Sequence, residues 1–374
     1  MTALAVRYTA ARTLDTAPAE TCPPGPGEVE LAPAFVGICG TDLHIFHGDM
    51  DTRVRTPAVL GHEMSGRIVR VGPDVDDWQP GDAVTVMPLR WDDTCPACRT
   101  GHQHICRHLD FIGIDSPGAM QQRWTVPATT LVRLPDSLPL DHAALVEPTA
   151  VAVHDVGRAA VRDGDKTVVV GGGPVGILIA LVARAAGADV RVVEPSAHRR
   201  ALAEQSGLTA WDPATADVPE LVRTWTQDAG ADVAFEVSGA AAGMDTAVDV
   251  LGVRGRLCLV AIHPRPREIN LHRFFWRELT LVGARLYDRG DFDKAVALVA
   301  DGTVPADRLI SKIVPLTEAP AAFEALQSGG DVMKILVDCT TQTTHADTDA
   351  GADTDADADA GADAGADAAQ GAAV

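Results

Sequence analysis

The chain has 374 residues, 46% of them hydrophobic, and carries a formal net charge of −21 at pH 7. This length gives room for more than one domain with a buried core. The negative charge argues against nucleic acids and anionic membranes as partners, because both would repel such a surface. The first residues lack the basic start and apolar run of a signal peptide, and seven cysteines indicate thiols or metal ligands rather than a disulfide framework. We therefore expect a cytoplasmic protein.

Short β-branched runs separated by glycines and prolines occupy the first part of the chain, with 66–71 and 82–87 as examples, and predict a β-rich domain. From about residue 165, strand-like runs alternate with helical patterns, which is typical of parallel strands joined by crossover helices in a doubly wound α/β sheet. The strand-like runs are 167–170, 189–193, 232–237, 256–262 and 279–283, and the clearest helical patterns are 175–186 and 197–206.

The last part of the chain changes character twice. A further helical pattern at 291–301 precedes strand-like runs at 309–315 and 333–337, and the simplest interpretation is a return to the first domain. The tail that follows is rich in Ala, Asp, Gly and Thr and contains no lysine or arginine, so we expect it to be disordered. The predicted organisation is a β-rich domain in 1–150, a nucleotide-binding domain in 151–285, the return in 286–339 and an acidic tail in 340–374.

A glycine-rich turn follows the first strand of the predicted parallel sheet. The sequence Gly171-Gly172-Gly173-Pro174-Val175-Gly176 is G-x-G-x-x-G at the start of a helix. Its glycines permit a tight turn, a close approach of a pyrophosphate and close helix–strand packing. Glu194 ends the next strand, where a carboxylate can accept hydrogen bonds from ribose hydroxyls and repel a 2′-phosphate, so NAD is favoured. Arg199 and Arg200 lie nearby and keep NADP open as the alternative.

Three segments of the first domain carry metal-ligand types. They contain Cys39, then His62 with Glu63, then Glu147. Together they offer a thiolate, an imidazole and carboxylates, the ligand set of a catalytic zinc that keeps one position open. Such a zinc lowers the pKa of a bound hydroxyl group, which makes loss of a hydride from the adjacent carbon feasible.

The chain resembles the zinc-dependent medium-chain alcohol dehydrogenases, most closely the threonine, butanediol and sorbitol dehydrogenase branch. The resemblance lies in the motifs VGICGTDLH (36–44), GHE (61–63), EP (147–148) and the glycine-rich turn, and in their order. The resemblance extends to about Asp338. It implies a GroES-like catalytic domain joined to a Rossmann domain, and hydride transfer between NAD and a small secondary alcohol, such as a polyol, a vicinal diol or threonine, to give the ketone. It also implies a homodimer or homotetramer built through the nucleotide domain, with 279–283 as the candidate edge strand.

The resemblance also assigns roles to residues of the first domain. Cys39 and His62 become zinc ligands, and either Glu63 or Glu147 supplies the next ligand. Asp42 is expected to orient His62, with a turn or capping role as the alternative.

A proton relay is implied by the same segment. Thr41 and His44 lie two and five residues after the metal thiolate, Cys39. Thr41 would pass the substrate proton towards the cofactor ribose and His44.

A second metal site is implied by Cys95, Cys98 and Cys106, which resemble the lobe that holds a structural zinc with four cysteines in these relatives. The position of the first cysteine is Asp92 here, and Asp93 is adjacent. Three thiolates and one carboxylate still form an acceptable tetrahedral zinc set, so we expect Asp92 to complete the site. The alternative is a zinc-free lobe.

The remaining histidines and cysteines are not expected to bind metal. The spacing of His102, His104 and His108 suits an exposed loop without a role, and Cys22, Cys258 and Cys339 are expected to be packing residues.

Two competing functions are weighed against this prediction. One is a zinc-free quinone or enoyl reductase of the same fold that uses NADPH, and the presence of the complete zinc ligand set disfavours it. The other is a nucleotide-binding protein without catalytic activity, which the presence of Thr41 and His44 disfavours. The motifs do not identify which alcohol is oxidised.

Overall fold

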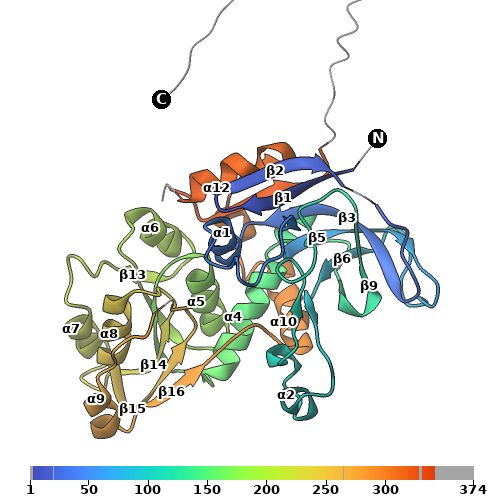
Figure 1. Cartoon of the computed structure of the whole chain (residues 1–374). Helices are drawn as coiled ribbons and strands as arrows, with labels where there is room; N and C mark the ends of the chain where they lie inside the picture. The colour runs from blue at the N-terminus through green and yellow to red at the C-terminus, as the bar shows by residue number, and fades with distance from the viewer. Residues whose placement is uncertain (1–2, 20, 264, 328–330, 342–374) are drawn as a thin grey trace, which may run out of the picture. The chain divides into compact units, whose positions relative to one another are not determined.

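The computed structural model describes residues 3–19, 21–263, 265–327 and 331–341 (Figure 1). The predicted disordered tail lies outside the described residues from 342 onward. In the part of the chain that the structure describes, no helix combines the length and apolar character needed to cross a membrane.

The first sheet has the strand order β10-β6-β5-β3-β18-β17, with β9 also paired to β3. Its strand β3 and the first half of β5 have runs of consecutive buried residues, which is the pattern of strands covered on both faces. A smaller sheet, β2-β1-β4, and the ribbon β7-β8 accompany it. The bounds are β1 (Leu4–Ala10), β2 (Thr13–Pro18), β3 (Glu28–Gly37), β4 (Ala58–Val59), β5 (Glu63–Val71), β6 (Ala83–Val86), β7 (Leu89–Arg90), β8 (Asp110–Phe111), β9 (Trp124–Pro127) and β10 (Leu131–Arg133).

Two strands from the end of the described chain complete this first sheet. They are β17 (Ile310–Pro315) and β18 (Lys334–Asp338), and β18 lies antiparallel to β3, with Leu336 opposite Gly37. The chain therefore returns to its first sheet after the nucleotide-binding region.

The second sheet is parallel, with the order β13-β12-β11-β14-β15-β16, which is the doubly wound arrangement. The predicted combination of a β-rich region with a doubly wound Rossmann-type sheet is confirmed. The strand bounds are β11 (Lys166–Val170), β12 (Asp189–Val193), β13 (Thr209–Trp211), β14 (Ala231–Glu236), β15 (Leu251–Leu259) and β16 (Thr280–Gly283).

Helices cover both faces of the parallel sheet (Figure 1). Val169 belongs to the core shared with α4 and α5, whereas Val168 and Val170 belong to the core under α7 and α8. Successive strand residues point to opposite faces, so the buried run of β11 contributes to both cores. The helix bounds are α1 (Gly40–Phe46), α2 (Pro96–Arg99), α3 (Leu140–Ala143), α4 (Val146–Arg158), α5 (Pro174–Ala185), α6 (Ala197–Gln205), α7 (Val218–Trp225), α8 (Ala241–Asp249), α9 (Leu271–Arg277), α10 (Arg289–Ala300), α11 (Ala306–Leu309) and α12 (Ala319–Gln327), with 3₁₀ turns η1 (Gln103–Ile105), η2 (Ala128–Thr130) and η3 (Leu316–Glu318).

Candidate metal centre and nucleotide-binding site

The pairing of β3 with β5 brings the first group of predicted ligands together. Glu63 begins β5 directly opposite Gly37, and Cys39 follows the end of β3 by two residues. A Cβ at residue 37 would lie 2.2 Å from Glu63 Oε2, so only glycine leaves room for this carboxylate. As a result, ligand atoms of Cys39, His62 and Glu63 all lie within 4.8 Å of one another. We call these three residues the catalytic triad.

The donor chemistry of the catalytic triad fits a zinc ion. A thiolate, an imidazole and a carboxylate form a three-ligand set of the kind found in catalytic zinc sites. His62 and Glu63 are 2% and 1% exposed, so solvent would scarcely compete for them. The ring of Phe111 meets the His62 ring edge-on, with centroids 5.1 Å apart, and limits its rotation.

A buried lysine accompanies Glu63. Lys334 Nζ lies 2.6 Å and 2.9 Å from the two carboxylate oxygens of Glu63 and also donates to the carbonyl of Ile38 at 3.2 Å. Lys334 is the first residue of β18, and the antiparallel pairing of β18 with β3 places it beside Ile38. Burial lowers the pKa of Lys334, but the charges of Glu63, Cys39 and Glu147 and the hydrogen bond to Glu63 together outweigh this and raise it overall.

Asp42 lies behind His62. Its Oδ1 is 3.7 Å from His62 Nδ1, its Oδ2 accepts a hydrogen bond from the Cys39 backbone at 2.9 Å, and the side chain is fully buried. Burial raises the pKa of Asp42, and the positive charge of a protonated His62 opposes this. Both expected roles of Asp42 are therefore compatible with its place, since it caps helix α1 and faces the histidine.

Glu147 lies in the first turn of α4, which packs against β5, and is 3% exposed. It is not part of the group in which Cys39, His62 and Glu63 converge. Burial raises the pKa of Glu147 to about 7, His62 opposes this, and the charge of Glu63 adds to it. The buried Tyr287 faces Glu147, whose charge contributes to a raised pKa of the phenol after burial itself. Glu147 is therefore not one of the converging ligands. Its position near His62 suits proton exchange or an approach to a metal ion held by the other three residues.

The two residues of the predicted proton relay lie on α1. Thr41 is half-buried in the first turn, next to Cys39. His44 is exposed, and its Nδ1 lies 3.2 Å from Asp49 Oδ2. A half-buried threonine followed by an exposed imidazole is the order that a path for protons towards solvent needs.

The glycine-rich turn has the geometry that binds a pyrophosphate. Gly171 has φ +108°, a conformation that favours glycine, and a Cβ on Gly176 would lie 1.8 Å from the Gly171 carbonyl oxygen. Gly173 caps α5, and Pro174 opens it, so backbone N–H groups at this end point towards a bound anion. Val175, the second residue of α5, is half-buried.

Glu194 lies at the carboxyl end of β12, beside the glycine-rich turn. Its two oxygens accept hydrogen bonds from the backbone of Gly172 at 2.7 Å and of Ser196 at 2.8 Å. Each oxygen keeps a second lone pair for a ribose hydroxyl. Arg199 is close to the same turn, since its guanidinium would lie 3.8 Å from a Cβ on Gly173.

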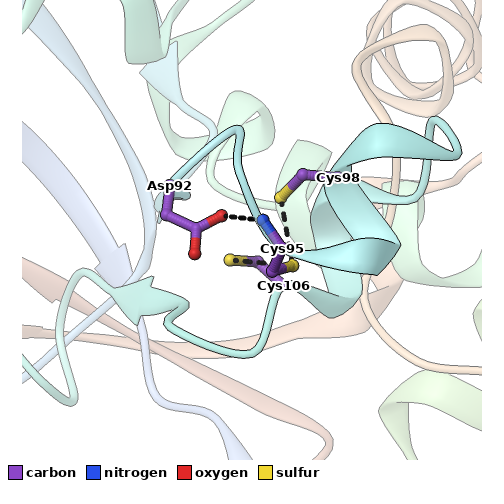
Figure 2. A group of neighbouring side chains, drawn as sticks. All are labelled: Asp92, Cys95, Cys98 and Cys106. Carbon is purple, nitrogen blue, oxygen red and sulfur yellow. Dashed lines mark hydrogen bonds between the residues drawn. The ribbon is translucent and has the colours of Figure 1, made fainter.

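The cysteine lobe, which we define as residues 92–106, brings its four predicted ligands together. The sulfur of Cys95 is 3.6 Å from that of Cys98 and 3.9 Å from that of Cys106, and Asp92 completes a group whose ligand atoms lie within 4.8 Å of one another. Figure 2 shows the carboxylate and the three sulfurs converging. Asp93 lies outside this group and accepts a hydrogen bond from Trp91 Nε1. Three thiolates and a carboxylate fit zinc.

Hydrogen bonds hold the carboxylate of Asp92 in place. His108 Nδ1 donates to Asp92 Oδ2 at 2.6 Å, and the backbone N–H groups of Cys95 and Thr94 both donate to Oδ1 at 2.9 Å. These bonds, that of His108 foremost, hold the pKa of Asp92 well below its usual range. An ionised, oriented carboxylate is the form that a metal requires.

The sequence-based expectations for His104 and Cys22 were wrong. His104 is not in an exposed position, since it is 7% exposed, because the turn η1 directs its side chain against α4. Cys22 is exposed and is not a packing residue, whereas Cys258 and Cys339 are buried as expected. His108 contacts Asp92, although no role was expected for it.

Sequence reasoning missed Lys334 and Tyr287. A lysine within the apolar sequence Met333–Val337 is itself a signal, because a strand buried on both faces rarely carries an ammonium group without a partner. Tyr287 carries no comparable signal, since its approach to Glu147 depends on how α4 and the segment after β16 pack.

A dinucleotide-binding turn at the carboxyl edge of a parallel sheet and a buried Cys-His-Glu group on a second sheet define a metal-dependent dehydrogenase. Two family models match, the alcohol dehydrogenase GroES-like domain over residues 25–136 and the zinc-binding dehydrogenase over residues 174–301.

Known proteins agree with these matches. 2-Dehydro-3-deoxy-L-galactonate 5-dehydrogenase of Pseudoalteromonas atlantica is 43% identical over 90% of this chain and 99% of its own length. (R,R)-Butanediol dehydrogenase of Neisseria gonorrhoeae is 32% identical over 84% and 93%. A solved structure from Sinorhizobium meliloti 1021, described as a zinc-binding dehydrogenase bound to NADP, has a TM-score of 0.85 and 31% identity, with coverage of 90% and 99%.

The chain therefore belongs to the zinc-dependent medium-chain alcohol dehydrogenase family, as its motifs predicted. It is an NAD(P)-linked enzyme that oxidises a secondary alcohol, and the prediction of that class over a zinc-free reductase or a non-catalytic protein is confirmed.

Proposed function

We propose that this enzyme oxidises a secondary hydroxyl group of a sugar acid to the ketone, with NAD as the hydride acceptor. The observation that carries the oxidation is the convergence of Cys39, His62 and Glu63. The sugar-acid class is supported by the relative that is 43% identical and named for a galactonate derivative, and by a positive group near the catalytic triad.

This positive group contains Arg53 and Arg285. Arg53 donates hydrogen bonds of 2.8 Å and 2.6 Å to Asp115, which also accepts one from the Phe111 backbone at 2.8 Å. Phe111 in turn contacts His62. Burial and the positive charge of Arg53 lower the pKa of Arg285, and Asp115 opposes this.

Asp115 is thus paired with Arg53, whereas Arg285 only feels its charge. The other nearby acid, Asp110, is already paired with Arg90. The excess positive charge fits a substrate carboxylate, which arginine binds through parallel hydrogen bonds.

The residues of the site have different roles in the reaction. Cys39, His62 and Glu63 would hold a zinc ion, which supplies the Lewis acidity that favours loss of the hydroxyl proton. Lys334 holds the Glu63 carboxylate in place through hydrogen bonds to both of its oxygens. Thr41 and His44 would carry the proton to solvent, and Glu147, whose pKa burial raises to about 7, would take up or release a proton within the buried site.

The choice of NAD is supported by Glu194. Its carboxylate is fixed beside the glycine-rich turn, where a 2′-phosphate would be repelled. Arg199 lies at the same turn, so NADP remains the competing cofactor.

We also propose that two copies associate through the nucleotide-binding region. β16 is the edge of the parallel sheet among the described strands, and α9, which precedes β16 in the chain and packs against β15, exposes Leu271, Phe275 and Trp276 by 73%, 78% and 74%. Exposed apolar side chains and an unpaired strand edge are each typical of an interface. Substitution Phe275→Glu is expected to lower the mass measured by light scattering.

The seven cysteines are all free thiols, which favours a location in the reducing cytoplasm.

The substrate test compares sugar acids, the corresponding neutral polyols, 2,3-butanediol and threonine, each with NAD and with NADP. We expect the largest kcat/KM with a sugar acid and NAD. Arg285→Met should raise KM for the acid about tenfold or more and leave the neutral polyol unaffected, since a hydrogen bond to a charged group contributes about 1.5–3 kcal/mol. Arg289→Met, on the exposed start of α10, is the matched control. Equal kcat/KM for acids and neutral polyols would refute the proposed substrate class.

A further inference from the structure

A third group of metal-ligand side chains lies apart from the catalytic triad and the cysteine lobe. Ligand atoms of His154, Asp288 and Asp291 lie within 4.8 Å of one another. His154 is on α4, whereas Asp288 caps α10 and Asp291 lies in its first turn. The two helices pack together, as Figure 1 also shows. His154 Nδ1 is 2.9 Å from Asp291 Oδ2.

Helix capping explains part of this arrangement. Asp288 and Asp291 form a capping box, in which the Asp288 backbone donates to Asp291 Oδ2 at 2.8 Å. A capping box needs neither a histidine from another helix nor further donors from another part of the chain. The convergence of His154 on the same carboxylates is therefore an addition to the cap.

Two further side chains point to a missing positive partner. His104, from η1 of the cysteine lobe, is 7% exposed, and its Nδ1 lies 2.8 Å from Asp288 Oδ1 without forming a hydrogen bond of acceptable geometry. Its ring is 4.8 Å from that of His154. Asp155 is 1% exposed, and neither of its carboxylate oxygens has a hydrogen-bond partner among the described residues. Buried polar atoms seldom lack partners, so each of these is evidence for an unplaced group.

The side chains around His154 carry more negative than positive charge, which also indicates a missing positive partner. Asp288 and Asp291 place two carboxylates against His104 and His154, and the negative charge of Asp291 also acts on the buried Asp155. A divalent cation bound beside Asp288 and Asp291 would offset these negative charges and would give the unpaired nitrogen of His104 a partner.

We propose that His154, Asp288 and Asp291 bind a third divalent metal ion, and that His104, which lies outside this group of three but contacts Asp288, completes the set as the fourth ligand. Two imidazole nitrogens and two carboxylate oxygens suit zinc or a related first-row metal in tetrahedral geometry. Such an ion would join the cysteine lobe, through His104, to the helix that carries Glu147. The proposal does not depend on which alcohol is oxidised.

The test is titration of the metal-free full chain with cobalt(II), followed by absorption spectroscopy. The catalytic triad and the cysteine lobe both contain thiolates and give thiolate-to-cobalt charge-transfer bands, whereas the proposed site contains no sulfur. We expect one metal equivalent that adds visible ligand-field absorption without charge transfer. If every bound equivalent carries a thiolate band, the proposal is overturned whatever the variants show.

Asp288→Asn is the main variant, because asparagine also caps helices but is a much poorer metal ligand. We expect it to lose the sulfur-free equivalent and to keep the thiolate-bound ones. Asp293→Asn, an exposed position on the same helix, is the matched control and should bind as the parent chain does. Should Asp288→Asn fail to fold, His154→Gln provides the same comparison. Retention of the sulfur-free equivalent in the variant, or its equal loss in the control, contradicts the assignment.

Discussion

The catalytic triad and the cysteine lobe are both sulfur-containing candidate metal sites, but they are assembled in different ways. All four ligands of the lobe come from residues 92–106, and its carboxylate is fixed by local backbone groups and by His108, whose side chain is 75% exposed. The catalytic triad joins the end of β3 to the start of β5, and its carboxylate is balanced by Lys334 from the other end of the described chain. A local site tolerates change around it, whereas a site built by long-range pairing depends on the whole sheet.

Loss of the catalytic triad should have the largest effect. Cys39→Ala is expected to lower kcat/KM about a thousandfold or more, because the Lewis acid contributes several kcal/mol and each 1.36 kcal/mol corresponds to a factor of about ten. The measurement is steady-state cofactor reduction with metal content determined on the same sample. Cys22→Ala, at an exposed thiol, is the control and should retain activity. Full turnover by Cys39→Ala would remove the functional difference between the two sites.

Loss of the buried counter-ion should come next. Lys334→Met leaves the Glu63 carboxylate buried without a partner, and we expect about 3–5 kcal/mol of lost stability in the absence of metal. Urea unfolding of the metal-free chain measures this loss. Adding Glu63→Gln to Lys334→Met should restore part of the stability, and Lys312→Met, on the exposed face of β17, should change little. Equal stability of all these chains would show that the triad needs no long-range charge balance.

In the cysteine lobe, Asp92→Ala should lower zinc affinity about 10- to 100-fold. Asp92→Cys should retain the metal, because it supplies a fourth thiolate. Competition with a chromophoric chelator measures both, and Asp136→Ala, on an exposed turn, is the control. Turnover should be retained in both Asp92 variants. Zinc affinity that is unchanged in Asp92→Ala would leave the carboxylate without a role in the lobe.

The smallest effect is expected for His108→Ala. The side chain is mostly exposed, so its bond to Asp92 should contribute at most about 1 kcal/mol to the stability of the zinc-loaded lobe. Thermal unfolding with and without zinc measures this contribution. A loss as large as that of Lys334→Met would contradict the distinction drawn between the two sites.

Local patterns in the sequence predicted the parts of the molecule that local chemistry determines. The alternation after residue 165 predicted the parallel sheet, and the run 189–193 matches β12 at both ends. The run 256–262 misplaced β15, which begins at Leu251, because pairing with Ala231 extends the strand before its apolar stretch. The glycine-rich turn and the ligands of the cysteine lobe were visible for the same local reason.

The surroundings of the ligands could not be predicted in this way. The contact of Lys334 with Glu63 depends on the register of β18 against β3, and no spacing along the chain encodes that register. The group around His154 depends on the packing of α4 against α10. The placement of Glu147 outside the converging ligands likewise follows from where α4 begins relative to β5.

The position of Lys334 has a consequence for biosynthesis. A ribosome makes Cys39, His62 and Glu63 early, but the ammonium group that neutralises Glu63 belongs to β18, close to the last described residues. Until that strand emerges and inserts next to β3, the nascent polypeptide holds an unneutralised acid in its first sheet. The charge balance of the active site is therefore completed only after β18 has been synthesised, although the ligands are made much earlier.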